Sequence, residues 1–349
     1  MKKILFTGGG SAGHVVPNLA LIEEVLSEGI ADVCYMGTNG IEKRLVAEWK
    51  LPYYQIECPK LIRGGGAEGL KRNLKIPVEF YRAVKSAKEG LATFRPDVVF
   101  SKGGYVSLPV VIAAKRLKIP CYCHESDFSI GLANRLAAGF CKRVFTSFPE
   151  TAKRVRHGKY SGAPLRRSVL SATKADARRK FNIPFNAEVL LVFGGGSGSA
   201  TINEAVRTHL KTLTQRYYVF HVCGKGNLIK STVQNYRQFE FISDMGMAYA
   251  CADVVLSRAG SGTIFEILAL KKPALLVPLE EQTRGDQKEN AAYFAEKGLC
   301  KVLNQNELYR LSKAVDSTAD SQELKDRLFS SQFVCGNQII LNELRKALQ

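Results

Sequence analysis

The sequence lacks several features that define other classes of protein. No apolar run approaches the roughly 20 residues that span a bilayer as a helix. The first residues already have the pattern of a strand, and they lack the apolar core and cleavage site of a signal peptide. The nine cysteines are scattered and form no CxxC pair. We therefore expect no zinc site and no disulfide framework, and reduced thiols indicate a cytosolic compartment.

Two arrangements of acidic residues are also absent. No Asp-x-Asp pair is present to hold a divalent metal between phosphates, so we expect neither a metal nor a cofactor requirement. The loop at residues 8–13 fits the GxGxxG pattern of dinucleotide binding, which needs a carboxylate at the end of the next strand. That strand, residues 33–37, ends without an acid, and Asp32 stands at its start. An oxidoreductase is therefore disfavoured.

Basic residues are in excess, with a formal net charge of +18. Part of the excess lies in residues 60–88, where basic and large apolar residues alternate around Pro77. This mixture favours an anionic membrane surface over a nucleic-acid groove, although an ordinary solvated helix face remains the alternative. No nucleic-acid-binding motif is present elsewhere. The basic residues are Lys60, Arg63, Lys71, Arg72, Lys75, Arg82, Lys85 and Lys88, and the apolar ones Leu70, Leu74, Ile76, Val78, Phe80 and Tyr81.

Glycine, by contrast, is concentrated in three short clusters, at residues 8–13, 103–104 and 194–198. Each follows an apolar run and precedes a helical pattern. Glycine in such a turn lets backbone N–H groups approach an anion at a helix N-terminus. Three such loops in two halves predict two Rossmann-like α/β domains that face each other across a phosphate-handling cleft. An enzyme that joins two phosphorylated substrates would have this organisation.

The apolar runs have the spacing of an α/β protein with buried parallel strands. We place a break near residues 162–164, which follow a polar stretch, and predict domains at 1–161 and 162–331. Residues 332–349 form a C-terminal helix with an apolar stripe. The predicted strands are residues 3–7, 33–37, 97–101, 119–124 and 144–148 in the first half, and 189–193, 217–223, 241–242, 254–257 and 273–278 in the second.

His14 is the first candidate for chemistry. It directly follows the first glycine loop, at the carboxyl end of a strand, where open α/β sheets bind their ligands. A histidine there can take a proton from a sugar hydroxyl near neutral pH. A lone histidine is more often structural, but its place in this loop favours a functional role.

Taken together, these motifs resemble the MurG family of bacterial cell-wall glycosyltransferases over nearly the whole chain. The resemblance implies the GT-B fold, with the last helix crossing back onto the first domain, and transfer of N-acetylglucosamine from its UDP donor to lipid I. The matching residues are Gly8 to His14, Gly103 to Ser107, His124-Glu125, Gly162, Pro164 and Arg166, Gly195 to Ser197, Phe241-Ile242, Arg258 to Glu266, Asp286-Gln287 and Asn290.

The resemblance assigns the second half to UDP-N-acetylglucosamine. Ser197 and its loop would hold the diphosphate at the helix from Ala200, with Arg166 as an added cation. Glu266 would bind the two ribose hydroxyls, although a capping-box acid three residues after Thr263 is the other interpretation. The implied donor residues are Arg166, Ser197, Ile242 for the uracil, Glu266, and Asp286 and Gln287 for the sugar hydroxyls.

The resemblance also assigns the first half to the acceptor, the undecaprenyl-linked muramoylpentapeptide lipid I. The basic stretch would lie on the cytoplasmic leaflet, so that attachment to the membrane is peripheral. Transfer to the C4 hydroxyl would proceed with inversion, with His14 as the favoured base, Glu125 second and Asp127 third. His14 could instead bind the diphosphate. The implied acceptor residues are Gly10, Ser11, Ala12, Gly13, His14, Gly103, Gly104 and Tyr105.

The chain departs from the family pattern at a few positions. Many relatives carry Gln-Asn where this chain has Ser126-Asp127, and Gln-Gly where it has Gly198-Ser199; Lys102 adds a cation before the second loop.

Other activities remain open: a glycosyltransferase that makes diacylglycerol glycolipids, a non-hydrolysing UDP-sugar epimerase, and a nucleotide-sugar-binding regulator without turnover. The first-half loops favour the cell-wall enzyme.

Overall fold

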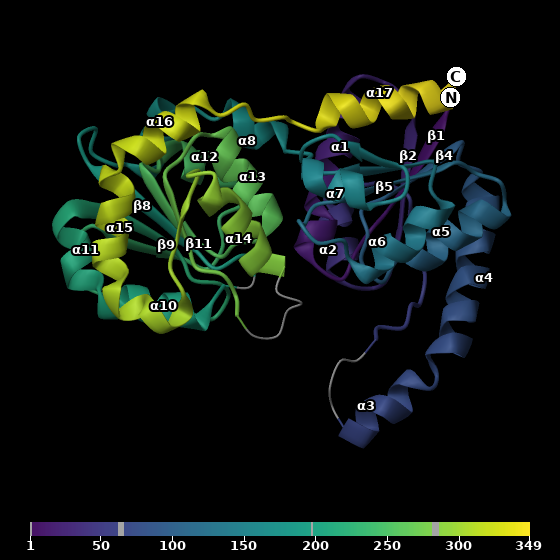
Figure 1. The fold of residues 1–349 in the computed structure, drawn as a ribbon, viewed down its shortest axis with the longest axis horizontal. Coiled ribbons are helices and arrows are strands. Elements are labelled where there is room, and N and C mark those ends of the chain that lie inside the picture. Colours follow the sequence, from purple (N-terminus) through teal and green to yellow (C-terminus); the bar gives the residue numbers. More distant parts are fainter. Residues whose placement is uncertain (1, 62–65, 197, 281–285) are drawn as a thin grey trace. The chain divides into compact units, whose positions relative to one another are not determined.

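The computed structural model describes residues 2–61, 66–196, 198–280 and 286–349. The chain divides into two compact units: unit 1 comprises Met1–Arg166 with Val334–Gln349, and unit 2 comprises Arg167–Phe333. Each unit has its own sheet, in which every strand runs parallel to its neighbours, with helices on both faces (Figure 1). The two predicted doubly wound α/β domains are therefore confirmed.

Unit 1 contains a seven-stranded sheet in the order β3-β2-β1-β4-β5-β6-β7. Its central strands are buried on both faces, as the continuous apolar runs predict. The short strands at the two edges were missed because they carry no apolar run. The strands are β1 (Lys3–Thr7), β2 (Asp32–Gly37), β3 (Tyr53–Gln55), β4 (Val98–Ser101), β5 (Cys121–Glu125), β6 (Arg143–Thr146) and β7 (Gly158–Tyr160).

Two helical layers cover this sheet. Ile4 and Phe6 of β1 face one layer, and Leu5 between them faces the other, because successive side chains of a strand alternate. The helices are η1 (Ala12–His14), α1 (Val16–Ser27), α2 (Ile41–Ala47), α3 (Gly66–Asn73), α4 (Ile76–Phe94), α5 (Ser107–Arg116), α6 (Leu132–Ala137), η2 (Ala138–Phe140), α7 (Pro149–Arg154) and α17 (Asn337–Leu348).

The C-terminal helix α17 is part of unit 1 and packs beside α1 (Figure 1). Leu341 and Leu344 of its apolar stripe are buried in the same cluster as Ile4 and Phe6. At its start, the Asn337 side chain bonds both backbone groups of Leu165, accepting from its N–H and donating to its carbonyl at 2.9 Å each. The start of α17 is thereby hydrogen-bonded to Leu165, near the end of the Met1–Arg166 segment of unit 1.

Unit 2 contains a six-stranded sheet in the order β10-β9-β8-β11-β12-β13. The strands are β8 (Glu188–Phe193), β9 (Tyr217–Val222), β10 (Tyr236–Phe239), β11 (Val254–Ser257), β12 (Ala274–Leu276) and β13 (Lys301–Val302). The helices are α8 (Arg167–Ser171), α9 (Lys174–Phe181), α10 (Ala200–Thr208), α11 (Leu210–Arg216), α12 (Met245–Cys251), α13 (Ser261–Ala269), α14 (Asp286–Glu296), η3 (Gln305–Arg310), α15 (Leu311–Asp320) and α16 (Gln322–Ser330).

One predicted strand in unit 2 is wrong. Residues 241–242 form a loop, and the strand β10 precedes them at Tyr236–Phe239, paired with β9. As an edge strand β10 is only partly buried. Its polar residues Arg237 and Gln238 interrupt the apolar pattern, so the sequence does not predict this strand. The correction places Phe241 and Ile242 just beyond the carboxyl end of a parallel strand, at the edge where ligands bind.

Candidate active site

Each sheet has one point at which its strand order reverses. In unit 1 this point lies between the neighbouring strands β1 and β4, and in unit 2 between β8 and β11. At such a reversal the loops leave toward opposite faces of the sheet and a crevice opens at the carboxyl ends of the strands. The three glycine clusters predicted to bind phosphate all lie here: two follow β1 and β4, and the third follows β8.

The two loops of unit 1 touch each other. Gly104 has a φ of +80°, and a Cβ built on it would lie 2.3 Å from the carbonyl oxygen of Gly9 and 3.2 Å from Nδ1 of His14. Only glycine permits both this conformation and this approach. The sequence therefore brings His14 against the second loop, although 90 residues separate the two in the chain.

His14 ends the short helix η1, and Val15, the N-cap of α1, follows it. The hydroxyl of Ser11 lies 2.9 Å from its Nδ1 and fixes the orientation of the ring. When Nδ1 carries the proton and donates it to Ser11, Nε2 holds the lone pair that can accept a proton from a substrate. The geometry therefore suits a general base at His14.

A buried carboxylate that sequence reasoning missed supports the first loop. Glu42, in the first turn of α2, is fully buried. Its Oε2 accepts from the N–H of Gly10 at 3.2 Å, and its Oε1 accepts from the N–H of Thr38 at 3.0 Å and from the Thr38 hydroxyl. The N–H of Gly10, predicted to bind the acceptor diphosphate, is thus bonded inside the protein.

Tyr105 completes this side of the site. A Cβ on Gly10, which has a φ of +82°, would lie 2.7 Å from the Tyr105 ring. Burial raises the pKa of the Tyr105 hydroxyl, and the Glu42 carboxylate raises it further. Tyr105 therefore remains protonated near neutral pH and can donate a hydrogen bond.

Glu125, the last residue of β5, is 5% exposed. Its carboxylate accepts three hydrogen bonds: from the N–H of Asp127 at 3.0 Å, the N–H of Gly131 at 2.9 Å and the Asn134 amide at 3.0 Å. Burial raises its pKa, as does Asp127, whereas Lys102 and the backbone hydrogen bonds lower it. Gly131 is the N-cap of α6, so Glu125 fixes the turn between β5 and that helix.

The third glycine loop joins β8 to α10 in unit 2. Ser199 is the N-cap of α10, and its hydroxyl accepts from the N–H of Ile202. Arg258, which follows β11, donates to this hydroxyl at 2.9 Å and to the carbonyls of Val277 and Pro278 at 3.2 Å each. Arg258 thereby links the segments that follow β8, β11 and β12, beside the reversal of strand order. Ser197, predicted to bind the diphosphate, lies outside the described residues.

The other donor candidates lie around the same edge of unit 2. Glu266 is half-buried in the second turn of α13, whose N-cap is Gly260. Since Thr263 lies inside this helix and not at its cap, the capping-box interpretation of Glu266 is wrong. Ile242 is buried in the loop after β10. Asp286 begins α14, and the side-chain oxygen of its neighbour Gln287 accepts from the N–H of Leu279 at 3.0 Å.

Arg166 is half-buried and is the last residue of the first segment of unit 1, directly before α8. It is therefore not part of unit 2, which carries the other candidate donor residues.

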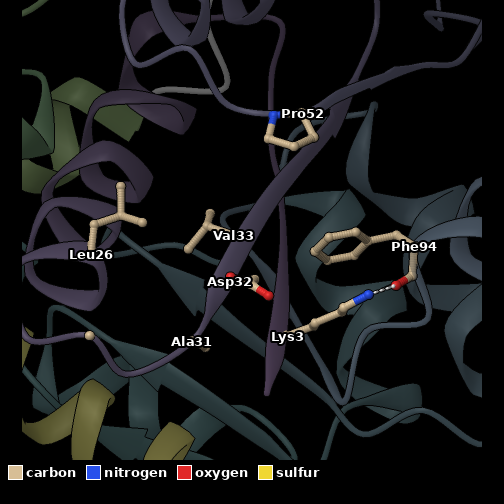
Figure 2. A pocket seen from close by; sticks show the side chains of 8 residues that line it. Lys3, Leu26, Ala31, Asp32, Val33, Pro52 and Phe94 are labelled. Carbon is tan, nitrogen blue, oxygen red and sulfur yellow. Dashed lines mark hydrogen bonds between the residues drawn. The ribbon is translucent and has the colours of Figure 1, made fainter. Parts of the chain in front are cut away.

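A pocket of about 420 Å³ lies at the opposite edge of the unit 1 sheet (Figure 2). Lys3, Asp32 and Phe94 are among the residues that line it, and the Lys3 ammonium donates to the Phe94 carbonyl at 3.2 Å. Asp32 begins β2, so it lies away from the glycine loops. A dinucleotide site of the Rossmann type would need an acid at the other end of that strand.

Two family models match this chain: the glycosyltransferase family 28 N-terminal domain over residues 4–146 and the family 28 C-terminal domain over residues 189–331. A UDP-N-acetylglucosamine--N-acetylmuramyl-(pentapeptide) pyrophosphoryl-undecaprenol N-acetylglucosamine transferase of Clostridium perfringens is 44% identical over 313 residues. The alignment covers 88% of this chain and 86% of the relative.

Among solved structures, MurG of Acinetobacter baumannii superposes with a TM-score of 0.73 at 26% identity, covering 99% of this chain and all of that one. A UDP-GlcNAc 2-epimerase of Neisseria meningitidis, bound to UDP-GlcNAc, has a TM-score of 0.66 at 16% identity over 99% of this chain and all of its own. At this identity, the similarity to the epimerase shows only that the two proteins share a fold. The chain belongs to the MurG family of N-acetylglucosaminyltransferases, within glycosyltransferase family 28.

Proposed function

We propose that this chain transfers N-acetylglucosamine from UDP-N-acetylglucosamine to the C4 hydroxyl of undecaprenyl-diphospho-muramoylpentapeptide, with inversion, to form lipid II. The observation that carries the proposal is the 44% identity, over 88% of the chain, to a transferase whose name states this donor and acceptor. Two glycine-loop sites, one at the strand reversal of each unit, support it, since two diphosphate-bearing substrates need two such sites.

The donor is assigned to unit 2. The N-terminus of α10 offers backbone N–H groups and a helix dipole to the UDP diphosphate. Arg258 braces this loop, and Arg166 is proposed as a further cation for the phosphates. These charges stabilise the negative charge that develops on the leaving UDP. Ser197 is proposed to contact the same phosphates, Ile242 the uracil, Glu266 the ribose, and Asp286 and Gln287 the sugar.

The acceptor is assigned to unit 1, where the loops that contain residues 10–14 and 103–105 lie against each other. His14 is proposed as the base that takes the proton from the C4 hydroxyl, because Ser11 orients its ring. Glu125 already accepts three hydrogen bonds and is nearly buried, so it suits a positioning role better than proton transfer. Tyr105 supplies a hydroxyl donor for the diphosphate.

The helices α3 and α4 are proposed as the surface that lies on an anionic cytoplasmic membrane. Leu70 and Leu74 are 67% and 73% exposed, and Val78 and Tyr81 are also exposed. Ile76 and Phe80 are only half-buried, and Phe80 packs against the core. Within the described ranges no helix is long and apolar enough to cross a membrane, and the proposed attachment is peripheral. The exposed basic neighbours are Lys71, Arg72, Lys75, Arg82 and Lys85.

The proposed reaction is tested by the choice of acceptor. With labelled UDP-N-acetylglucosamine, we expect label to enter a lipid I analogue and not diacylglycerol. Labelled diacylglycerol would support the glycolipid alternative, and conversion of the donor without any acceptor would support an epimerase.

The same assay in excess EDTA tests whether the reaction needs a metal ion. We expect the lipid I analogue to be labelled equally with and without EDTA. If activity were lost in EDTA and restored by magnesium, the assignment of phosphate stabilisation to helix N-termini and arginine would fail.

Replacement of Glu266 tests the donor site. The Glu266→Ala enzyme should show a donor KM about 10- to 150-fold higher, since a charge-assisted hydrogen bond contributes roughly 1.5–3 kcal/mol. Its acceptor KM should stay nearly unchanged. Glu296→Ala, which removes an exposed acid of the same unit, is the matched control. Steady-state kinetics with each substrate varied in turn gives both constants, and an unchanged donor KM would remove Glu266 from the site.

Vesicle binding tests the membrane surface. Each basic residue near an anionic leaflet contributes about 1 kcal/mol, within a Debye length. We expect co-sedimentation with phosphatidylglycerol or cardiolipin vesicles that weakens with salt and is slight on neutral lipid. Changing Lys71, Arg72 and Lys75 to Glu should release the protein but preserve turnover of a water-soluble acceptor.

The matched control changes three exposed basic residues elsewhere on unit 1, Lys115, Arg116 and Lys142, to Glu. This triple variant should still bind the vesicles. Equal binding by the wild type and the α3 variant would place the membrane surface elsewhere, and binding by neither would leave α3 and α4 as a solvated face.

A further inference from the structure

A chain of buried polar side chains links the edge of the unit 2 sheet to helix α10. Its members are Tyr236, at the start of β10, His221, near the end of β9, and Asn203, inside α10. All three side chains are buried, and His221 is 0% exposed. Because water does not reach such groups, their polar atoms depend on partners within the protein.

The carbonyl of Cys223 fixes the direction of this chain. The Asn203 amide nitrogen lies 2.9 Å from that carbonyl oxygen, which can only accept, so the amide presents its NH2 group there. The amide oxygen Oδ1 then lies 2.9 Å from Nε2 of His221 and accepts its proton. Nδ1 of His221 is left as an acceptor, and the Tyr236 hydroxyl donates to it at 2.9 Å. Every hydrogen bond of the chain therefore points from Tyr236 toward Cys223.

This arrangement requires a neutral His221, because only the neutral imidazole has one donor nitrogen and one acceptor nitrogen. Burial, followed by the guanidinium of Arg207 on α10, lowers the pKa of His221 to about 4. At neutral pH the ring therefore carries a single proton, and the hydrogen bonds on either side of it place that proton on Nε2.

Cys223 lies where β9 meets the third glycine loop. It directly follows β9, and a Cβ on Gly198, which has a φ of +79°, would lie 2.1 Å from its carbonyl oxygen. Only glycine permits this approach. The N–H of Gly198 donates to the carbonyl of Gly195 at 3.1 Å, and the N–H of Asn203 donates to the carbonyl of the N-cap residue Ser199 at 2.8 Å. The Cys223 carbonyl is thus in contact with both the loop and the helix that the loop leads into.

We propose that this chain positions the third glycine loop: it holds the Cys223 carbonyl against Gly198, at the N-terminus of α10. Without the Nε2 proton of His221, the Asn203 amide loses the contact that fixes its orientation toward the carbonyl. Tyr236, His221 and Asn203 are therefore positioning residues, which act through the backbone and do not touch substrate. The proposal rests on the proposed function in one respect, since the loop is assigned there to the donor diphosphate.

NMR of the full-length protein with 15N-labelled histidine tests the direction of the chain. Correlation of ring protons with both ring nitrogens at neutral pH gives the tautomer of each of the five histidines, and the His221→Gln spectrum identifies the signals of His221. We expect a protonated Nε2 and a bare Nδ1, and Tyr236→Phe should shift the Nδ1 signal toward that of a nitrogen without a donor. An Nδ1–H tautomer or an imidazolium at this position would overturn the proposal.

Hydrogen–deuterium exchange of the ligand-free protein tests whether the chain holds the loop. His221→Leu should speed exchange at residues 194–203 at least fivefold, because a buried polar group left without its partner corresponds to roughly 5- to 150-fold in an equilibrium. His221→Gln should exchange close to the wild-type rate, since its amide can still donate to Asn203. Residues 301–320, in β13 and α15, should exchange as in the wild type in both variants.

Kinetics separate this positioning role from a general loss of stability. His221→Leu should raise the donor KM by a similar factor, roughly 5- to 150-fold, and leave the acceptor KM unchanged. His221→Gln should restore most of the donor affinity. The matched control His209→Leu removes a half-buried histidine at the end of α10 and should leave the exchange rates and both KM values unchanged.

The positioning role is overturned if residues 194–203 exchange at the wild-type rate in His221→Leu. It is also overturned if exchange rises equally at residues 301–320, because loss of stability alone would then explain the result. If the wild type fails to label a lipid I analogue, the proposed function fails. The histidine spectra and the ligand-free exchange still decide the chain in that case, because neither needs a substrate.

Discussion

The reversal of strand order in each parallel sheet is the constraint on which the rest of the structure depends. It opens one crevice between β1 and β4 in unit 1 and one between β8 and β11 in unit 2. At each crevice a glycine loop leads into the N-terminus of a helix, where the helix dipole favours negative charge. Glycine at these turns permits this backbone geometry, and buried charged side chains in both units bond to the loops that form it.

Buried charges hold these loops in shape. Glu42 bonds the N–H of Gly10, Glu125 bonds three donors in the turn before α6, and Arg258 joins Ser199 to the end of β12. Each buried ion has several hydrogen-bond partners, as burial of a charge requires. Leaving any of them unpartnered would be costly, so these hydrogen bonds stabilise the backbone segments that they join.

The central strands and the glycine loops could be predicted from the sequence because buried parallel strands are continuously apolar and tight βα turns need glycine. Edge strands such as β3 and β10 could not, since one side of each is partly solvated and carries polar residues. Glu42 was missed because its partner Gly10 lies 32 residues earlier, and nothing local marks that contact. The sequence shows that Lys102 places a cation before the second loop. It does not predict that Lys102 is buried against Ser126, because that contact depends on the pairing of β4 with β5.

We propose that the donor diphosphate binds at the strand reversal of unit 2 and not at that of unit 1. Hydrogen–deuterium exchange with saturating UDP tests this most directly, because bound phosphate protects the amides that donate to it. We expect slower exchange in peptides that cover residues 194–203 and 258–266, with no change at residues 8–16 and 102–107. Protection of the unit 1 loops, with unit 2 unaffected, would contradict it.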